Sequence, residues 1–423
     1  MSRTLPSGDQ EGKCMKKLVM FGAGKIGRSF IGQLFSRAGY EVVFVDVFEP
    51  VIKALNERQA YSVIIKADTH EEILSIDHVS GVLATDTEKV ADEISTADIC
   101  ATAVGINALP AVFPLIAKGL LKRFSVSAVS KMDIIIAENM RDAAPYFARE
   151  LKIIAGQSYP FDELVGLVET SIGKMVPIMS EKDVQADILQ VFAEPYNTLI
   201  VDKKGFKNLV PAVPGIAAKE NIKAWVDRKS FIHNLGHAAT AYIGHVYDSH
   251  FIYLYEALAV KDVYQEVRTV MLQSADILLK EYSDEFTLAD LTVHIDDLLH
   301  RFMNKALGDT IFRVGRDVIR KLGPQDRITG IITKGLCYNM PVDKIVRVLV
   351  CGMFFRATGE NGLLFERDAV FVHDYFSKGI RYVLVHVCGF NEKNDEDLIR
   401  TCEIYSNALS HALANHKDAL CQK

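Results

Sequence analysis

The most constraining feature of this sequence is a glycine-rich loop between a buried apolar run and a helical stretch. Gly22, Gly24 and Gly27 form the pattern G-x-G-x-x-G directly after the apolar residues 18–21. In such a loop the first glycine permits a tight turn, the second lets the backbone approach a pyrophosphate, and the third lets the helix pack closely. The loop therefore predicts a strand, a turn and a helix that together bind a dinucleotide.

An acidic residue at a suitable distance supports this interpretation and favours NAD as the cofactor. The predicted helix at residues 26–38 is followed by a strand at residues 42–45, which leads into Asp46, 19 residues after Gly27. A carboxylate there can accept hydrogen bonds from the ribose of NAD and would repel the 2′-phosphate of NADP. Arg28 is the residue that could favour NADP instead. The residues expected to bind the cofactor are Gly22, Gly24, Lys25, Ile26, Gly27, Asp46 and Val104.

Alternating strand-like and helix-like stretches predict an α/β fold in the first half, with a doubly wound parallel sheet of the Rossmann type. Strands are expected at residues 17–21, 42–46, 98–104, 125–129 and 134–137, and a helix at residues 51–58. The strand at 98–104 runs into small residues, and the carboxyl ends of strands line the cofactor crevice of such a sheet. Later in the chain, helices are expected at residues 217–228, 230–247, 251–282 and 395–416.

The chain of 423 residues is too long for one hydrophobic core and suits two domains. A turn-rich segment at residues 195–215 places the boundary close by. We expect a disordered extension at 1–14, a Rossmann dinucleotide-binding domain at 15–200, and a mostly α-helical substrate and catalytic domain at 201–423. The extension is polar and lacks the apolar core of a signal peptide or an anchor.

Composition argues against several classes of protein. The net charge of −6, without a basic stripe, disfavours a nucleic-acid-binding surface. The longest apolar runs, such as residues 383–387, are far shorter than the roughly 20 residues of a membrane span. The seven cysteines are scattered and never form C-x-x-C, which favours reduced thiols in the cytoplasm over disulfides or structural zinc.

A second polar cluster lies in the stretch VDRKSFIHNLGHAATAYIGH. In an α-helix, Asn234 lies about 140° and His237 about 80° round the axis from Lys229, so the three fan over one side. These three side chains can act together on one small molecule. The amine can take a proton, the amide can donate to an oxyanion, and the imidazole can orient a hydroxyl. A solvated polar face is the alternative. His233 and His237 are spaced like zinc ligands, but no acid lies between them, so no metal is expected.

Motifs along nearly the whole chain resemble the polyol-specific long-chain dehydrogenases, and among these most closely the mannitol-1-phosphate 5-dehydrogenases. They are FGAGKIGRSFIG at 21–32, TAVG at 102–105, AENM at 137–140, FKNLVPAVPG at 206–215, VDRKSFIHNLGHAATAYIG at 226–244, and RVGRDVIRKL at 313–322. The pattern K-x-x-x-x-N-x-x-H is specific to this family, whereas the glycine loop is shared with many others. The resemblance implies interconversion of mannitol 1-phosphate and fructose 6-phosphate with NAD, by hydride transfer without a metal.

The resemblance also implies roles for individual residues. Lys229 would be the catalytic base, Asn234 and Asn139 would stabilise the developing oxyanion, and His237 would position the substrate hydroxyl. Taken alone, Asn139 would be interpreted as a helix cap. The presence of these residues speaks against a non-catalytic dinucleotide sensor, which needs no proton acceptor.

The identity of the sugar is left open by two features. Where the family commonly has V-D-R-I-x-P, this chain has Gly173 and Lys174 in place of the aspartate and arginine. Free fructose or mannitol, or a hexuronate and its aldonate, are therefore alternative substrates. A substrate phosphate could be bound by bidentate hydrogen bonds from three arginines spaced three and four residues apart. A solvated helix face, or ion pairs with nearby aspartates, would explain these arginines equally well. The three arginines are Arg313, Arg316 and Arg320. The expected partners are a sugar phosphate or polyol, with the protein a monomer or small homo-oligomer.

Overall fold

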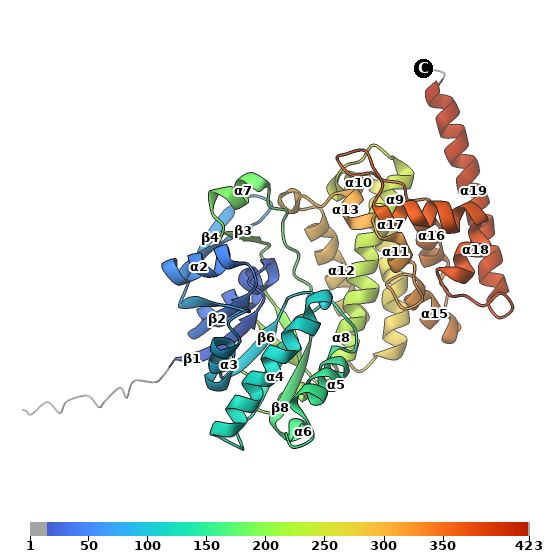
Figure 1. Ribbon diagram of the computed structural model, residues 1–423. Helices are drawn as coiled ribbons and strands as arrows, with labels where there is room; N and C mark the ends of the chain where they lie inside the picture. The colour runs from blue at the N-terminus through green and yellow to red at the C-terminus, as the bar shows by residue number, and fades with distance from the viewer. Residues whose placement is uncertain (1–14, 422–423) are drawn as a thin grey trace, which may run out of the picture. The chain divides into compact units, whose positions relative to one another are not determined.

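The computed structural model describes residues 15–421 and divides into two compact units (Figure 1). The first unit runs to Ile222 apart from Ala67–Thr69, and the second comprises Ala67–Thr69 and the chain from Lys223. The expected extension at residues 1–14 lies outside the described residues. The contacts divide the chain 22 residues later than position 200, because one strand spans that position and another follows it, and both belong to the sheet of the first unit.

The first unit is built on an eight-stranded sheet with the order β11-β10-β8-β7-β6-β1-β2-β5. Its strands are β1 (Lys16–Phe21), β2 (Tyr40–Asp46), β5 (Val79–Leu83), β6 (Ile99–Thr102), β7 (Met132–Ile136), β8 (Val165–Ser171), β10 (Leu199–Asp202) and β11 (Ile216–Lys219). All neighbouring strands are parallel except β8 and β10. The chain leaves β1 towards β2 and later crosses to β6 on the other side of β1. This confirms the doubly wound sheet and places its switch point between β1 and β6.

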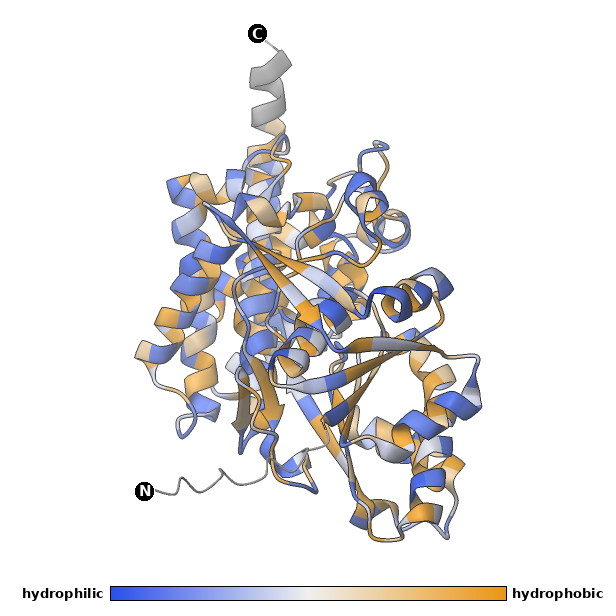
Figure 2. Cartoon of the chain, turned by 90° about the vertical axis from the view of Figure 1, so that its left-hand side faces the viewer, coloured by the Kyte–Doolittle hydropathy of each residue, from blue (hydrophilic) through white to orange (hydrophobic). Residues whose placement is uncertain are grey.

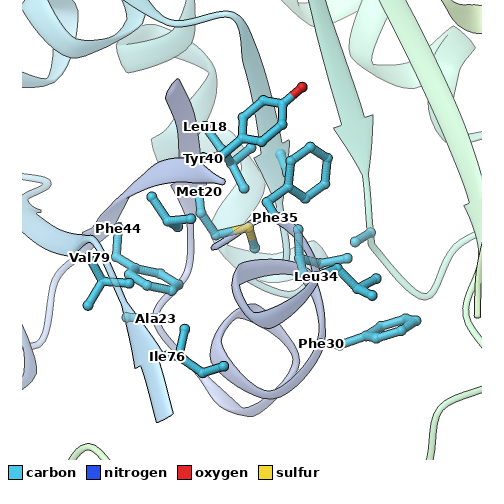
Figure 3. Close-up of a cluster of buried hydrophobic side chains, with 14 of the residues drawn as sticks. Leu18, Met20, Ala23, Phe30, Leu34, Phe35, Tyr40, Phe44, Ile76 and Val79 are labelled. Atoms are coloured by element: carbon cyan, nitrogen blue, oxygen red, sulfur yellow. The ribbon is translucent and has the colours of Figure 1, made fainter. Parts of the chain in front are cut away.

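The two faces of the sheet are buried against different helices, because successive residues of a strand point to opposite faces. Leu18 and Met20 of β1 belong to one apolar core, together with Phe30 and Phe35 of the segment that follows the glycine loop (Figure 3). Val19 and Phe21 belong to a second core, which also contains side chains of α3, α4 and α5. The helices of the first unit are η1 (Gly27–Gly32), α1 (Gln33–Arg37), α2 (Glu49–Arg58), α3 (Thr87–Thr96), η2 (Ile106–Ala108), α4 (Leu109–Val126), α5 (Ala143–Ala155), α6 (Phe161–Leu164), α7 (Glu181–Ala186) and η3 (Lys203–Gly205).

Several expectations for individual elements of this unit were wrong. No strand forms at 125–129, because α4 continues to Val126 and the next strand, β7, begins only at Met132. Residues 217–219 are the end of strand β11 rather than the start of a helix. The sequence also did not predict a three-stranded sheet of order β4-β3-β9. Its strands are β3 (Ala60–Lys66), β4 (Glu71–Asp77) and β9 (Val191–Ala193).

The second unit is helical, as expected, and α9 is its central element. This helix is apolar on nearly all sides and is buried between α10, α11, α13 and α16. Most of the helices visible in Figure 2 carry both blue and orange residues. In order, the helices of the second unit are α8 (Ile222–Arg228), η4 (Lys229–Asn234), α9 (Leu235–Tyr247), α10 (Leu254–Ala259), α11 (Lys261–Glu281), α12 (Leu288–Phe302), η5 (Lys305–Leu307), α13 (Ile311–Gly315), α14 (Val318–Lys321), α15 (Thr329–Cys337), α16 (Asp343–Met353), α17 (Glu366–Val370), η6 (Phe371–Tyr375), η7 (Phe376–Lys378), α18 (Ile380–His386) and α19 (Glu396–Cys421).

Among the described helices, none combines the length and the apolar character that crossing a membrane requires.

Candidate active site

The three glycines of the loop after β1 have different surroundings, which match the tasks expected for them. Gly22 has a φ of +97°, and a Cβ there would lie 2.5 Å from the carbonyl oxygen of Ala103. A Cβ at Gly27 would lie 1.9 Å from the carbonyl oxygen of Gly22, so only glycine lets the helix approach the strand this closely. Around Gly24, by contrast, no described atom would come within 4 Å of a Cβ. The open space at Gly24 fits the close approach of a pyrophosphate.

Asp46, at the end of β2, holds the glycine loop in place. The backbone N–H of Ala23 donates to its Oδ2 at 2.7 Å, and the N–H of Phe48 donates to its Oδ1 at 2.9 Å. The carboxylate is only half-buried and lies where an NAD ribose would be recognised. Lys25, in the same loop, is exposed, and Ile26 is half-buried.

Arg28 does not present its charge to a 2′-phosphate, because it is buried and used inside the domain. Its Nε donates to the carbonyl oxygen of Ala23 at 2.7 Å, and its Nη1 donates to those of Ile188 and Leu189 at 2.9 and 2.6 Å. Burial lowers the pKa of Arg28 from its ordinary value, against the opposing effect of Tyr61 and Asp46. The one residue that could have favoured NADP therefore has a structural role.

Glu138, which the sequence reasoning passed over, organises the segment after β6. The backbone N–H groups of Val104 and Gly105 donate to its two carboxylate oxygens, each at 2.9 Å. The segment passes the glycine loop, since a Cβ at Gly22 would lie 3.3 Å from Cγ1 of Val104. Asn139 follows Glu138 and is exposed. The available signal for Glu138 was an acidic residue directly after the apolar run at residues 134–137.

In the second unit, Lys229, Asn234 and His237 are singled out by their accessibility. Over residues 229–240 these three are half-buried and the other nine are buried. The side chains that can reach a ligand from this stretch are therefore the three that the sequence selected. A helix face exposed to bulk solvent would show a broader band of accessible residues.

The backbone between Lys229 and Asn234 is a π-helical turn, so the α-helical angles expected for these residues were wrong. The N–H of Leu235 donates to the carbonyl oxygen of Ser230, five residues earlier. A bond from i to i+5 brings residues five apart to the same side of the helix, as the α-helical bond does for residues four apart. Asn234 therefore follows Lys229 on one side instead of lying about 140° away.

Helix α11 stabilises this wider turn. The hydroxyl of Ser274, which is fully buried, donates to the carbonyl oxygen of Phe231 at 2.5 Å. Close packing continues at Gly236, where a Cβ would lie 2.5 Å from the sulfur of Met271. A carbonyl group inside the π-turn thus has a hydroxyl partner from a neighbouring helix, which offsets the cost of burying it.

His237 is bound to a carboxylate and stacked on a ring. Its Nε2 lies 2.9 Å from Oδ2 of Asp309, whose side chain is only 4% exposed and also forms an ion pair with Arg313. The imidazole stacks on Phe302 with ring centroids 4.8 Å apart. Burial lowers the pKa of His237 well below its ordinary value, and the cations Arg313, Arg327, Lys321 and Arg301 act in the same direction. The imidazole is therefore neutral near pH 7.

His233 is packed in the core of the unit, with ring centroids 5.6 Å from Phe302 and 6.2 Å from His237. Burial, followed by the charge of Arg301, lowers the pKa of His233 well below its ordinary value. Within the described part of the chain, no three histidine, cysteine or acidic side chains are grouped so that they could hold a metal ion.

The three arginines expected to share one helix face do not do so, because the predicted helix is broken. Helix α13 ends at Gly315, and α14 begins only after Asp317, which has a left-handed backbone with a φ of +67°. Arg313 pairs with Asp309, while Arg320 pairs with Asp317 at 2.6 Å and with Asp326 at 3.2 Å. The ion pairs of Arg313 and Arg320 with nearby aspartates agree with the alternative interpretation of these arginines, in which they form ion pairs and do not bind a phosphate.

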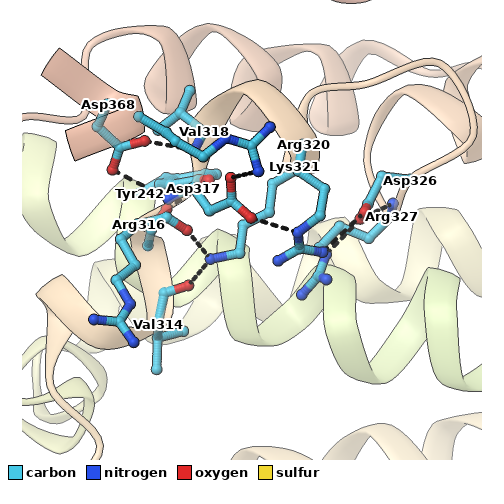
Figure 4. A network of polar contacts seen from close by, with 12 residues as sticks. Tyr242, Val314, Arg316, Asp317, Val318, Arg320, Lys321, Asp326, Arg327 and Asp368 are labelled. Atoms are coloured by element: carbon cyan, nitrogen blue, oxygen red, sulfur yellow. Dashed lines mark hydrogen bonds and ion pairs between the residues drawn. The ribbon is translucent and has the colours of Figure 1, made fainter. Parts of the chain in front are cut away.

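The remaining cations of this segment are arranged differently (Figure 4). Arg316 is exposed and lies over the rings of Phe312 and Phe365, with its guanidinium carbon 5.7 and 5.3 Å from their centroids. The ammonium of Lys321 is buried and donates to the carbonyl oxygens of Val314 and Arg316. Burial, aided by Arg327 and Arg320, lowers the pKa of Lys321 to about 7.

The departure at Gly173 and Lys174 is part of a buried structural contact. The Nζ of Lys174 donates to the carbonyl oxygens of Tyr196 at 2.7 Å and Glu194 at 3.2 Å, and to Oδ1 of Asn197 at 3.1 Å. This lysine thus connects the segment after β8 to the segment that leads into β10.

Comparison with known families accounts for most of the chain. Residues 16–215 match the mannitol dehydrogenase Rossmann domain, and residues 221–374 match the mannitol dehydrogenase C-terminal domain. The chain belongs to the mannitol dehydrogenase family. As a member of this family it is an NAD-dependent polyol oxidoreductase. The C-terminal helices α18 and α19 lie beyond the matched residues.

Solved structures share the fold of this family member over nearly its full length. The crystal structure of a D-sorbitol dehydrogenase in substrate-free form has a TM-score of 0.77 at 14% identity, covering 93% of each chain. The ternary complex of Pseudomonas fluorescens mannitol 2-dehydrogenase with NAD and D-mannitol has a TM-score of 0.71 at 15% identity, covering 97% of this chain and 95% of that one. At such identities the likeness shows a common fold.

Proposed function

We propose that this protein interconverts mannitol 1-phosphate and fructose 6-phosphate with NAD, using Lys229 as the general base. The observation that carries the proposal is the accessibility pattern of the π-turn and α9. A base, an amide and an imidazole are the three partly accessible residues along an otherwise buried stretch. A helix that served only for packing would have apolar residues at these positions.

Bound NAD supplies the hydride acceptor for polyol oxidation, and the residues of this chain handle the proton and the developing charge. The amine of Lys229 takes the proton of the substrate hydroxyl while the hydride leaves the same carbon. The amide of Asn234 donates to the oxygen as negative charge develops on it, and for Asn139 the same role stays a prediction from the family resemblance. In the reverse direction, the ammonium of Lys229 returns the proton to the oxygen of the reduced keto group.

For the phosphate group, Arg316 is the best candidate among the three arginines. It is exposed, and it has no ion pair within the described residues, whereas Arg313 and Arg320 are each paired with a carboxylate. An unpaired guanidinium can offer its fork of N–H groups to a phosphate without first breaking another interaction.

A second candidate is the oxidation of a free polyol, for which two observations speak. Two of the three candidate phosphate ligands already form ion pairs with aspartates, and the ammonium of Lys174 already donates to buried carbonyl oxygens. Free fructose and mannitol, or a hexuronate and its aldonate, are the corresponding substrates.

The deciding experiment measures NADH oxidation with fructose 6-phosphate, fructose and a hexuronate side by side at pH 7. Activity with the phosphate ester alone supports the first proposal. Activity with a free sugar alone would replace it with the second. Tight NADH binding without turnover on any of them would contradict both.

A further inference from the structure

We infer that Asp309 fixes the tautomer of His237, so that this imidazole accepts a hydrogen bond from a substrate hydroxyl next to the reacting carbon. The tautomer itself follows from contacts within the second unit. The identity of the hydroxyl rests on the proposed function, in which Lys229 takes the proton at the reacting carbon.

Three contacts determine where the proton of the imidazole lies. Asp309 is nearly fully buried and is paired with Arg313, which keeps it a carboxylate. A carboxylate can only accept hydrogen bonds, so Nε2 of His237, 2.9 Å away, must carry the proton. Stacking on Phe302 holds the plane of the ring independently of Asp309.

The consequence concerns the other ring nitrogen. In a neutral imidazole with the proton on Nε2, Nδ1 has a lone pair and no hydrogen. It cannot donate to a keto oxygen or to an alkoxide, because both are themselves acceptors. The proton of the reacting hydroxyl goes to Lys229 in the proposed reaction, so it is not available to His237 either. Nδ1 is thus matched to a hydroxyl on a neighbouring carbon, which can donate to it in both the polyol and the keto-sugar.

The tautomer can be measured without turnover, by NMR of the protein carrying 15N-labelled histidine at neutral pH. The His237 signal is assigned by its absence in His237→Gln. We expect the shifts of a neutral ring protonated at Nε2. A ring protonated at Nδ1, or a charged ring, would overturn the inference even if the enzyme turned over fructose 6-phosphate. Conversely, an Nε2-protonated ring in a protein that reduces none of the sugars would leave the tautomer established and remove the proposed function.

The substitution Asp309→Asn tests the link to catalysis. Arg313 can donate only to the carbonyl oxygen of the new amide, so the amide N–H group turns towards His237 and forces the proton onto Nδ1. We expect kcat/KM for the sugar to fall about 10- to 100-fold, with NADH binding unchanged and the NMR signature reversed.

The matched control is Asp296→Asn, which removes the same charge from another aspartate–arginine pair, with Arg268, away from the histidine. This variant should retain wild-type kinetics. Wild-type kcat/KM in Asp309→Asn, with its tautomer reversed, would overturn the role of His237 as an acceptor.

Discussion

Lys229 is the residue on which the proposed chemistry depends most directly. Replacing it with alanine removes the proton acceptor, so turnover should fall by about 100- to 10,000-fold at every pH. NADH binding should be retained, because the glycine loop and Asp46 belong to the other unit. Steady-state kinetics and a titration of NADH fluorescence measure the two effects separately.

Lys223→Ala is the matched control for this variant. Lys223 is an exposed lysine of α8, and its contact with Glu281 is long, at 3.8 Å. Its removal should leave kcat unchanged. Substantial turnover in Lys229→Ala would exclude Lys229 as the base, whatever the control shows.

The residues predicted from the sequence and those found only in the structure differ in the kind of pattern that marks them. Lys229, Asn234 and His237 are polar positions within an apolar helical stretch, and such a contrast is visible locally. Asp309 is hydrogen-bonded to His237, which lies 72 residues earlier in the chain. Ser274 donates to the carbonyl oxygen of Phe231, which lies 43 residues earlier. No periodicity connects residues so far apart, so single-sequence reasoning had no means of pairing them.

At the level of elements, different glycines of the loop between β1 and η1 are needed for folding and for cofactor binding. Gly27→Ala should destabilise the protein by roughly 1–3 kcal/mol or more, because its Cβ would collide with the backbone of Gly22. Gly24→Ala should keep wild-type stability but weaken NADH binding, because its Cβ would occupy the space for the pyrophosphate. Thermal unfolding and NADH titration of the two variants should therefore give opposite results. Equal NADH affinity in Gly24→Ala and wild type would show that the cofactor does not approach this glycine.

The π-turn η4 depends on a hydroxyl of helix α11. Ser274→Ala leaves the buried carbonyl of Phe231 without this donor, which should cost about 1–3 kcal/mol of stability. Loss of the turn would also rotate Lys229 away from Asn234, so kcat should fall while KM for NADH is unchanged. Thr269→Ala is the control, since it removes an exposed hydroxyl from the same helix. A loss of stability in Ser274→Ala with an unaltered kcat would mean that the turn does not serve the alignment.

Elements that follow a buried apolar run or the glycine loop were predicted well, and the smaller second sheet was not predicted. Strands β1, β2 and β6, with the helices after β1 and β2, follow from buried apolar runs and the glycine loop. The sheet of β3, β4 and β9 was missed: β9 joins β3 from more than a hundred residues away, whereas β3 and β4 form a local hairpin that was not predicted either. The strand expected at 125–129 was wrong because the first two of these residues are the last two of α4.

For the whole molecule, buried histidines should make stability depend on pH below about 6.5. Burial lowers the pKa of His233, His237 and His294 well below 6.5, and that of His245 to about 4. The unfolded chain binds protons at its ordinary histidine pKa, which the folded chain does not do until the pH is much lower. The free energy of unfolding is therefore highest above pH 6.5 and falls as the pH is lowered, by up to roughly 1.4 kcal/mol per pH unit for each histidine.

His245→Asn tests this without touching the proposed active site. Nε2 of His245 accepts from the backbone N–H of Arg356, and an asparagine oxygen can replace it as the acceptor. Between pH 6.5 and 5, the urea-derived free energy of unfolding should fall by about 1–2 kcal/mol less in this variant than in wild type. His373→Asn, at a 90% exposed position, should match the wild-type slope. Identical slopes in all three proteins would show that His245 titrates normally in the fold.

A π-turn contains one more residue than an α-turn, so η4 can be regarded as an α-helix that has absorbed a single-residue insertion. The helices on either side, α8 and α9, directly adjoin the turn. A single inserted residue is therefore enough to align a base with an amide, and no additional helix or strand is needed. By the same reasoning, deleting any one residue between 229 and 234 would leave the hydrophobic core almost intact. It would nevertheless rotate the residues before the deletion by about 100° about the helix axis, relative to those after it. The number of residues in this segment thus determines on which side of the helix Lys229 lies relative to Asn234.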